Sequence, residues 1–150
     1  MSKLFSPITI RGETFKNRVF VSPMCQYSSE HQDGHPTDWH MVHLGSRAVG
    51  GAGLVMFEAT AVTPSGRITP WDLGIWDDQH IQSYKNISDF ILSQGAIPGI
   101  QLAHAGRKAS HDRPWQGGGS LATHNGGWDP IAPSPIPYVE ADPMPRELSI

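Results

Sequence analysis

The stretch from Arg18 to Thr60 constrains the fold of this chain more than any other part of the sequence. A short apolar run at 19–21 is followed by a polar loop, a segment with helical spacing at 38–50, and a second apolar run at 54–57. This order of strand, loop, helix and strand is a βαβ unit, which builds a parallel sheet through a right-handed crossover. The sequence therefore predicts a parallel α/β fold.

Helical spacing of apolar side chains occurs in two segments. In the segment at 38–50 the residues that recur at this spacing are Trp39, Val42, Ser46 and Val49. In a second segment, which Asp77 can cap and Gly95 closes, one face is formed by Ile81, Tyr84, Ile87 and Ile91. We expect a helix in each segment.

A third strand is predicted from Ile97 to His104, because its side chains alternate between two faces. The alternation places Gln101 on the inner face, where a buried amide without a partner costs roughly 1–3 kcal/mol. A ligand that bonds the amide edge-on would satisfy it. At the other end of the chain, alternation around Arg11-Gly12 predicts a short hairpin.

The segment at 106–150 departs from this pattern, because it holds seven of the thirteen prolines and has no convincing periodicity. Its end, from Pro145 to Ser149, predicts the entry to a helix with Ser149 as the cap. The 150 residues are fewer than the roughly 250 of most TIM barrels. We therefore expect the N-terminal part of a TIM (β/α)8 barrel: a hairpin at 1–17, about three βα units at 18–105, and a loop or lid at 106–150.

Composition excludes several classes of partner. The formal net charge is −3 and the eleven Lys and Arg residues are scattered, so we expect no nucleic-acid partner. No apolar run approaches the roughly twenty residues of a membrane span, and no secretion signal is expected. The single cysteine cannot form an internal disulfide, which favours a reducing cytoplasm.

Polar groups near the carboxyl ends of the predicted strands are the candidate functional residues, since barrel enzymes place their sites there. Cys25 and Tyr27 follow the first strand, and Gln101 lies near the end of the third. Each also has an ordinary interpretation: an inert buried thiol, a surface phenol and a satisfied core amide. His40 and His43 share one helix face, but no cysteines or clustered carboxylates complete a metal site, so we expect none.

Three motifs carry a resemblance to a known family: SPMCQYS after the first strand, GSRAVGGAGLVMFEAT across the next crossover, and IQLAHAGRK at 100–108. Together they resemble the Old Yellow Enzyme family of flavin-dependent ene-reductases, and in particular its cysteine-containing branch of xenobiotic reductases. The resemblance implies that the complete protein uses FMN, takes hydride from NADPH or NADH, and reduces the C=C bond of α,β-unsaturated carbonyl or nitro compounds.

The resemblance also implies roles for particular residues. Cofactor contacts fall on Pro23, Met24, Cys25, Ala59 and Gln101. Cys25 would lie beside the flavin and tune its reduction potential through a weak S–H contact, and Tyr27 would donate to the substrate. These two are the expected catalytic residues. Lys108, with Arg107 beside it, would border the substrate opening.

Two alternatives remain open from the residues alone. The chain is a non-catalytic half-barrel that needs a complementary chain, or it belongs to another barrel enzyme such as an aldolase or a metal-dependent hydrolase. In either case we expect it to need the missing C-terminal part of the barrel, and a homo-oligomer is possible once the barrel is complete. Alone, the chain should be insoluble, misassembled or molten, because an open half-sheet exposes its edges.

Overall fold

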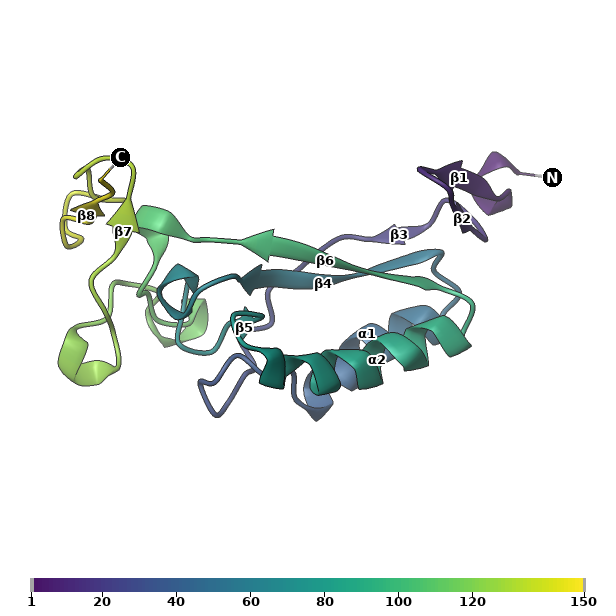
Figure 1. Cartoon of the computed structure of the whole chain (residues 1–150), viewed down its shortest axis with the longest axis horizontal. Helices are drawn as coiled ribbons and strands as arrows, with labels where there is room; N and C mark the ends of the chain where they lie inside the picture. Colours follow the sequence, from purple (N-terminus) through teal and green to yellow (C-terminus); the bar gives the residue numbers. More distant parts are fainter. Residues whose placement is uncertain (1, 150) are drawn as a thin grey trace.

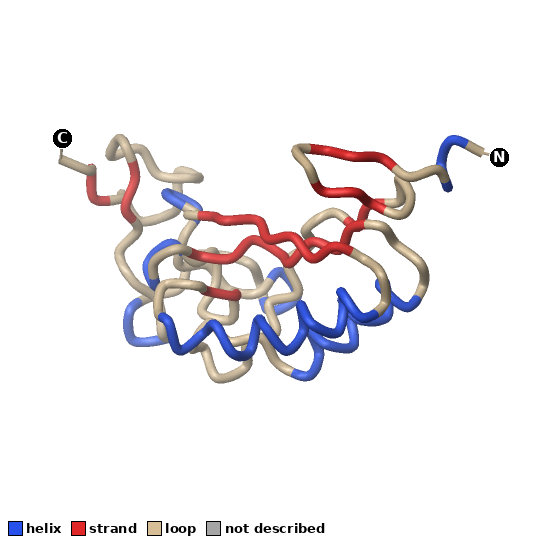
Figure 2. The backbone as a smooth tube through the Cα atoms, turned by 45° about the vertical axis from the view of Figure 1, so that its right-hand side comes forward, coloured by secondary structure: helices blue, strands red, loops and turns tan. Residues whose placement is uncertain are grey.

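A parallel sheet with two helices on one face forms the centre of the molecule, in a computed structural model that describes residues 2–149 (Figures 1 and 2). The strands are β1 (Ile8–Ile10), β2 (Glu13–Phe15), β3 (Phe20–Val21), β4 (Leu54–Ala61), β5 (Leu73–Gly74), β6 (Ile97–Ala103), β7 (Ile131–Ala132) and β8 (Arg146–Glu147). The α-helices are α1 (Asp38–Val49) and α2 (Ile81–Ser93). Short 3-10 helices are η1 (Lys3–Phe5), η2 (Pro64–Gly66), η3 (Asp78–His80), η4 (Gly106–Lys108), η5 (Pro114–Gln116) and η6 (Thr123–Asn125).

The central strand of the sheet is β4, and all of its pairings are parallel. It pairs with β3 at its start, with β5 at its end, and with β6 along its whole length. Helices α1 and α2 make the crossovers between β3, β4 and β6, and both lie on the same side of the sheet (Figure 2). The predicted βαβ order is confirmed, and the fold is the α/β arrangement of part of a barrel. Strand β5 was not predicted, because its two residues lie within a proline-rich loop.

The pairing of β4 with β6 contains a bulge. The register runs evenly from Leu54 to Phe57, then shifts so that Ala59 pairs with Gln101 and Glu58 has no partner across the ladder. A bulge adds one residue to one strand and changes which side chains point to which face. This shift decides where the side chains at the carboxyl end of β4 lie.

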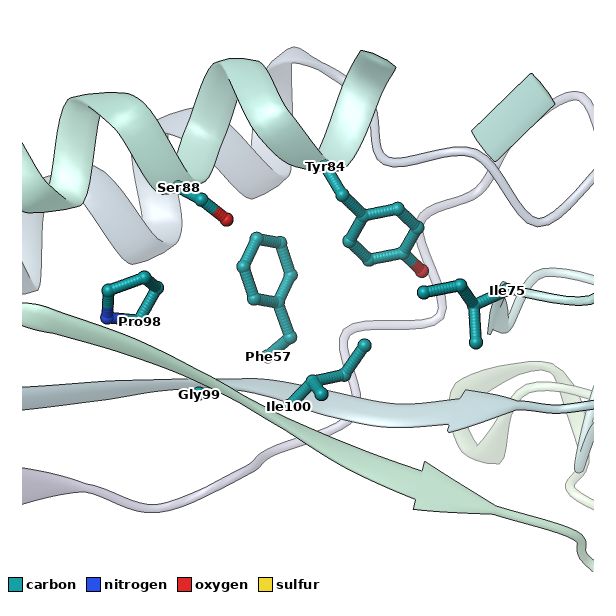
Figure 3. Close-up of a pocket in the computed structure, with 7 residues that line it drawn as sticks. All are labelled: Phe57, Ile75, Tyr84, Ser88, Pro98, Gly99 and Ile100. Carbon is teal, nitrogen blue, oxygen red and sulfur yellow. The ribbon is translucent and has the colours of Figure 1, made fainter. Parts of the chain in front are cut away.

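The hydrophobic core lies between the helices and one face of the sheet. Its most deeply buried members are Val55, Leu73 and Ile91, each 0 % exposed. Phe57 of β4 packs against Tyr84 of α2 with ring centroids 5.2 Å apart, between the helix and the sheet (Figure 3). The core is therefore a single layer, and the opposite face of the sheet carries no helix in the described part of the chain (Figure 1).

The predicted face of α1 is wrong, because all four of its residues are exposed: Ser46, and Trp39, Val42 and Val49 with 50 %, 60 % and 64 % exposure. The buried residues of α1 are instead His40, Leu44, Gly45 and Ala48. Small residues are favoured there because α2 approaches closely: a Cβ at Gly45 would lie 2.9 Å from a ring carbon of Phe90. On α2, Tyr84, Ile87 and Ile91 are buried as predicted, whereas Ile81 is 55 % exposed.

The two ends of the chain lie at opposite ends of the sheet (Figure 1). Strands β1 and β2 form the antiparallel hairpin that the alternation predicts. The predicted helix entry at 145–149 is wrong, since Arg146–Glu147 forms β8 and pairs in parallel with β7. Prolines at 143 and 145 favour extended backbone before this point, and the backbone of β7 supplies the hydrogen-bond partners. Within residues 2–149, no helix has both the length and the apolar character needed to cross a bilayer.

Candidate functional site

The loop after β3 brings Cys25 against the end of β4. The Cys25 thiol is half-buried and lies within hydrogen-bond reach of the backbone of Ala59 and the side chain of Tyr27. Burial, and after it the negative charges of Asp72 and Glu58, raise the pKa of this thiol from 9.0 to about 11. At neutral pH the group is therefore a neutral S–H and not a thiolate nucleophile.

Tyr27 occupies a strained position in the same loop. Its φ angle is 51°, in the left-handed region that side chains other than glycine rarely adopt. Burial, and then the neighbouring Cys25, raise the pKa of the phenol from 10.0 to about 12, so it keeps its proton and can donate a hydrogen bond. Trp115 packs against the ring at a centroid distance of 6.0 Å.

Ala59 and Gln101 lie side by side on β4 and β6, where the register pairs them directly. Both line a cavity of about 230 Å³ at the carboxyl ends of the strands, together with Lys108 and Asp72. The expected burial of Gln101 is wrong, since its side chain is exposed. The inner face of the sheet is open beside it, so the amide is accessible to a ligand and pays no burial cost.

A second cavity, of about 320 Å³, adjoins the first. Tyr27 and Lys108 line it together with residues of the C-terminal segment, including His111, Tyr138 and Asp142. Lys108 lines both cavities, and its ammonium group lies 5.5 Å from the ring centroid of Tyr138. The structure thus brings Tyr27 and Lys108 to one opening.

The remaining predicted residues lie at the edge of this site. Pro23 is half-buried and Met24 is 46 % exposed, with its carbonyl oxygen accepting a bond of 2.8 Å from the Gln26 amide. Arg107 points to the C-terminal segment, where its guanidinium donates to the Ser134 hydroxyl at 3.0 Å. Arg107 therefore anchors that segment in this structure.

Three buried polar side chains at or behind the site were not predicted to take part in it: Glu58, His40 and Asp72, of which Asp72 also lines the first cavity. Asp72 is 2 % exposed and accepts hydrogen bonds from the backbone of Ile68 and Thr69 and from the Thr69 hydroxyl. Burial raises its pKa from 3.8 to about 6. Glu58 is 4 % exposed and lies 3.6 Å from the fully buried His40. The signal for Glu58 was present in the sequence, as the only charged residue within the apolar strand LVMFEATA.

The two histidines of α1 do different things. The ring Nδ1 of His40 accepts a hydrogen bond of 2.9 Å from the backbone N–H of Thr37, which caps the helix. His43 stacks on Trp39 at a centroid distance of 6.2 Å. Across residues 2–149, no group of three or more His, Cys, Asp and Glu side chains is arranged to hold a metal ion.

Two arginines hold the C-terminal segment over the site, and the guanidinium group of each contacts two tryptophan rings. The Arg113 guanidinium lies 4.1 Å from the ring centroid of Trp71 and 5.9 Å from that of Trp115. Arg67 lies 5.3 Å from the centroid of Trp76 and 5.1 Å from that of Trp128. Each arginine links one tryptophan of the loop before α2 to one tryptophan of the C-terminal segment, which holds this segment over the carboxyl ends of the strands.

Parallel strands, helices on one face and candidate site residues at the carboxyl ends of the strands define this chain as part of a TIM barrel. A family model described as the NADH:flavin oxidoreductase / NADH oxidase family matches residues 3–134. The chain belongs to this family, which decides against an aldolase or a metal-dependent hydrolase.

Solved structures agree with this assignment. Morphinone reductase matches with 26 % identity and a TM-score of 0.76, covering 97 % of this chain and 39 % of that protein. The Old Yellow Enzyme homologue of Zymomonas mobilis matches with 26 % identity and a TM-score of 0.77, covering 99 % and 40 %. A 2-naphthoyl-CoA reductase shares the fold at 22 % identity and a TM-score of 0.81, covering 98 % and 22 %. The chain spans about two fifths of the length of the first two proteins.

Proposed function

We propose that this chain supplies the first three barrel strands, β3, β4 and β6, of an FMN-dependent NAD(P)H oxidoreductase. The complete enzyme reduces the C=C bond of α,β-unsaturated carbonyl or nitro compounds. Membership of the NADH:flavin oxidoreductase family supports the flavin and the nicotinamide coenzyme. Similarity to morphinone reductase, one structure of which is a complex with tetrahydroNAD, supports the same coenzyme class. The three quoted motifs favour the ene-reductase branch within this family.

The observation that carries the proposal is the convergence of Cys25, Ala59 and Gln101. The register pairs Ala59 with Gln101, and the Cys25 thiol lies against the backbone of Ala59. A flat heteroaromatic ring fits such a surface, because the small side chain of Ala59 leaves room for it and the amide of Gln101 offers one donor and one acceptor. When bound there, FMN supplies the hydride chemistry.

The residues of this chain then have separate tasks. Cys25 presents a neutral S–H beside the ring and forms no covalent bond to it. The Tyr27 phenol donates a hydrogen bond to the substrate carbonyl oxygen, where negative charge develops during reduction. Lys108 lies at the opening that Tyr27 also lines, and its positive charge favours an electron-rich substrate group there.

The rest of the barrel is the partner that this structure requires under the proposal. Strand β6 pairs only with β4 in the described part of the chain, and its Leu102 is 63 % exposed. An unpaired edge of this length needs a neighbouring strand. The exposed apolar side chains of α1 need a covering helix in the same way. This partner is either a continuation of the same polypeptide or a complementary chain, and a reducing cytoplasm suits the single thiol.

The proposal is tested on the natural polypeptide that contains these residues, purified from its source. We expect visible absorption bands of bound flavin, and oxidation of NADH or NADPH that depends on an added α,β-unsaturated ketone. The two coenzymes are compared at equal concentration. A protein that takes up no FMN when it is supplied in excess would refute the proposal, and the mass of the purified polypeptide shows whether the barrel is one chain or two.

A further inference from the structure

A buried carboxyl group lies directly behind the loop that carries Cys25 and Tyr27. Glu58 is the bulged residue of β4, and its side chain is 4 % exposed. Its Oε1 accepts a hydrogen bond of 3.0 Å from the backbone N–H of Gln26, and the backbone N–H of Tyr27 lies within hydrogen-bond reach of the same carboxylate. Glu58 therefore binds the two consecutive N–H groups that follow Cys25.

The other oxygen of this carboxylate faces the Nε2 atom of a histidine, and within residues 2–149 this atom has no other polar neighbour at hydrogen-bond distance. His40 is 0 % exposed, and its Nδ1 accepts from the backbone N–H of Thr37, so the ring proton of the neutral form lies on Nε2. This Nε2 is buried, makes no hydrogen bond to any residue that the structure describes, and lies 3.6 Å from Oε2 of Glu58. A buried N–H group of this kind is stabilised only by the carboxyl group that it faces.

We propose that Glu58, held in place by His40, is a positioning residue that fixes the backbone of residues 25–27 and adds to the negative charge that the Cys25 thiol experiences from Asp72. The functional meaning of this pair rests on the proposed roles of Cys25 and Tyr27 in flavin chemistry. The physical claim concerns the thiol alone, so it is tested without flavin.

The charged and titratable groups around Glu58 come from every element that packs on it. Cys25 and Tyr27 face it from the loop after β3, His40 from α1 with His43 one turn further on, Asp72 from the loop before β5, and Tyr84 from α2. Among residues 2–149, no positively charged side chain is among the causes of its pKa shift. Burial raises that pKa from 4.5 to about 7, and the Asp72 carboxylate acts in the same direction. Glu58 thus gains its charge as the pH rises through neutrality.

The experiment measures the reaction of Cys25 with a small neutral disulfide reagent in the natural polypeptide, with the adduct on the peptide that contains Cys25 quantified by mass spectrometry. Glu58→Gln keeps the side-chain volume and an acceptor oxygen for Gln26 but cannot become charged. At pH 8.5 we expect the variant to react faster than the wild type, by up to about threefold, because removing a nearby negative charge lowers the thiol pKa. At pH 5.5, where Glu58 is neutral in both proteins, the rate ratio should return to about one.

Asp89→Asn is the matched control, because it removes the same charge from an exposed position on α2. Its rate ratio to the wild type should stay near one at both pH values. A Glu58→Gln ratio that does not change with pH, or an Asp89→Asn ratio that rises in the same way, would overturn the proposal. Should Glu58→Gln fail to fold, the test uses the wild type alone. A plot of the logarithm of its Cys25 reaction rate against pH should rise less steeply around pH 7, and a straight line through that region counts against the proposal.

The part played by His40 has its own pair of variants. His40→Gln places an amide N–H where the ring N–H lies, whereas His40→Leu removes it. We expect the pH at which the slope of the logarithmic rate changes to stay near the wild-type value in His40→Gln. In His40→Leu it should move to higher pH, since the Glu58 carboxylate has then lost the polar N–H group that faces it. An unchanged pH in His40→Leu would refute the supporting role of His40. A protein that passes these tests and yet binds no FMN would refute the proposed function and leave this inference standing.

Discussion

The state of the Cys25 thiol is the most direct test of how the site works. The pKa of the thiol is about 11 in the folded chain, against an ordinary value of 9.0 for a cysteine. The thiolate fraction at pH 8 is therefore about one hundredth of that in an unfolded chain. A more basic thiolate attacks disulfides faster, by a factor that offsets about half of this difference on a logarithmic scale. We therefore expect Cys25 to react about ten times more slowly in the folded protein than in urea.

The assay is the same adduct measurement on the peptide that contains Cys25, made at pH 8 with and without a denaturing concentration of urea. A small neutral reagent is used so that charge repulsion does not slow the folded protein. The physical cause of the slow rate is first the burial of the thiol and then the charges of Asp72 and Glu58. This cause predicts that the ratio of the two rates depends on folding and not on the reagent concentration.

A folded protein that reacts as fast as the unfolded one, or faster, would refute the reasoning. It would mean that Cys25 is an activated nucleophile, with a thiolate stabilised by a group that the geometry does not contain. The proposed S–H contact with a flavin would then be replaced by covalent chemistry. The measurement therefore separates two roles for the same residue.

Three further predictions concern stability. Ile91→Ala should lower the free energy of unfolding of the natural polypeptide by about 3 kcal/mol in urea titrations, because Ile91 is fully buried, whereas Ile81→Ala at an exposed position should cost less than about 1 kcal/mol; equal effects would contradict the core assignment. Arg113→Lys should speed hydrogen exchange at 113–128, since lysine cannot stack on Trp71 and bind Glu30 as the guanidinium does; unchanged exchange would show that other contacts hold the segment. The isolated chain should bind a hydrophobic dye and melt without a sharp transition, and a cooperative melt of the purified monomer would contradict this.

The pH dependence of stability follows from the same buried groups. The pKa of Glu58 is raised from 4.5 to about 7, so its contribution is fully present below pH 4.5 and is lost as the pH rises through 7, by about 3 kcal/mol. The pKa of His40 is lowered from 6.5 to about 4, mainly by burial, so its contribution is lost as the pH falls from 6.5 to 4. The two contributions oppose each other between pH 4.5 and 6.5. From pH 7.5 to pH 5, the free energy of unfolding should therefore fall more in Glu58→Gln than in the wild type. Urea titrations at these two pH values measure the change, and an equal change in both proteins would contradict the prediction.

The sequence predicted the order of strands and helices because apolar periodicity and capping residues are local signals. It also placed Cys25, Tyr27 and Gln101 at one edge of the sheet, since the carboxyl ends of parallel strands meet there. The buried face of α1 could not be predicted in this way. Trp39 and Val42 carry the stronger apolar signal, but Gly45 and Ala48 face the core because their size lets α2 approach, which depends on a neighbour far along the chain.

The bulge in β4 explains both the missed carboxylate and the open cofactor surface. In a regular strand, alternation from Val55 and Phe57 on the helix side would turn Glu58 toward the inner face and Ala59 toward the helices. The extra residue reverses this order: Glu58 meets His40 behind the sheet, while Ala59 pairs with Gln101 and lines the inner cavity. One inserted residue thus removes a charge from the surface on which we propose that a flavin lies and puts a methyl group in its place. The bulge also places the Glu58 carboxylate behind Cys25, where its charge acts on the thiol without contact to a ligand.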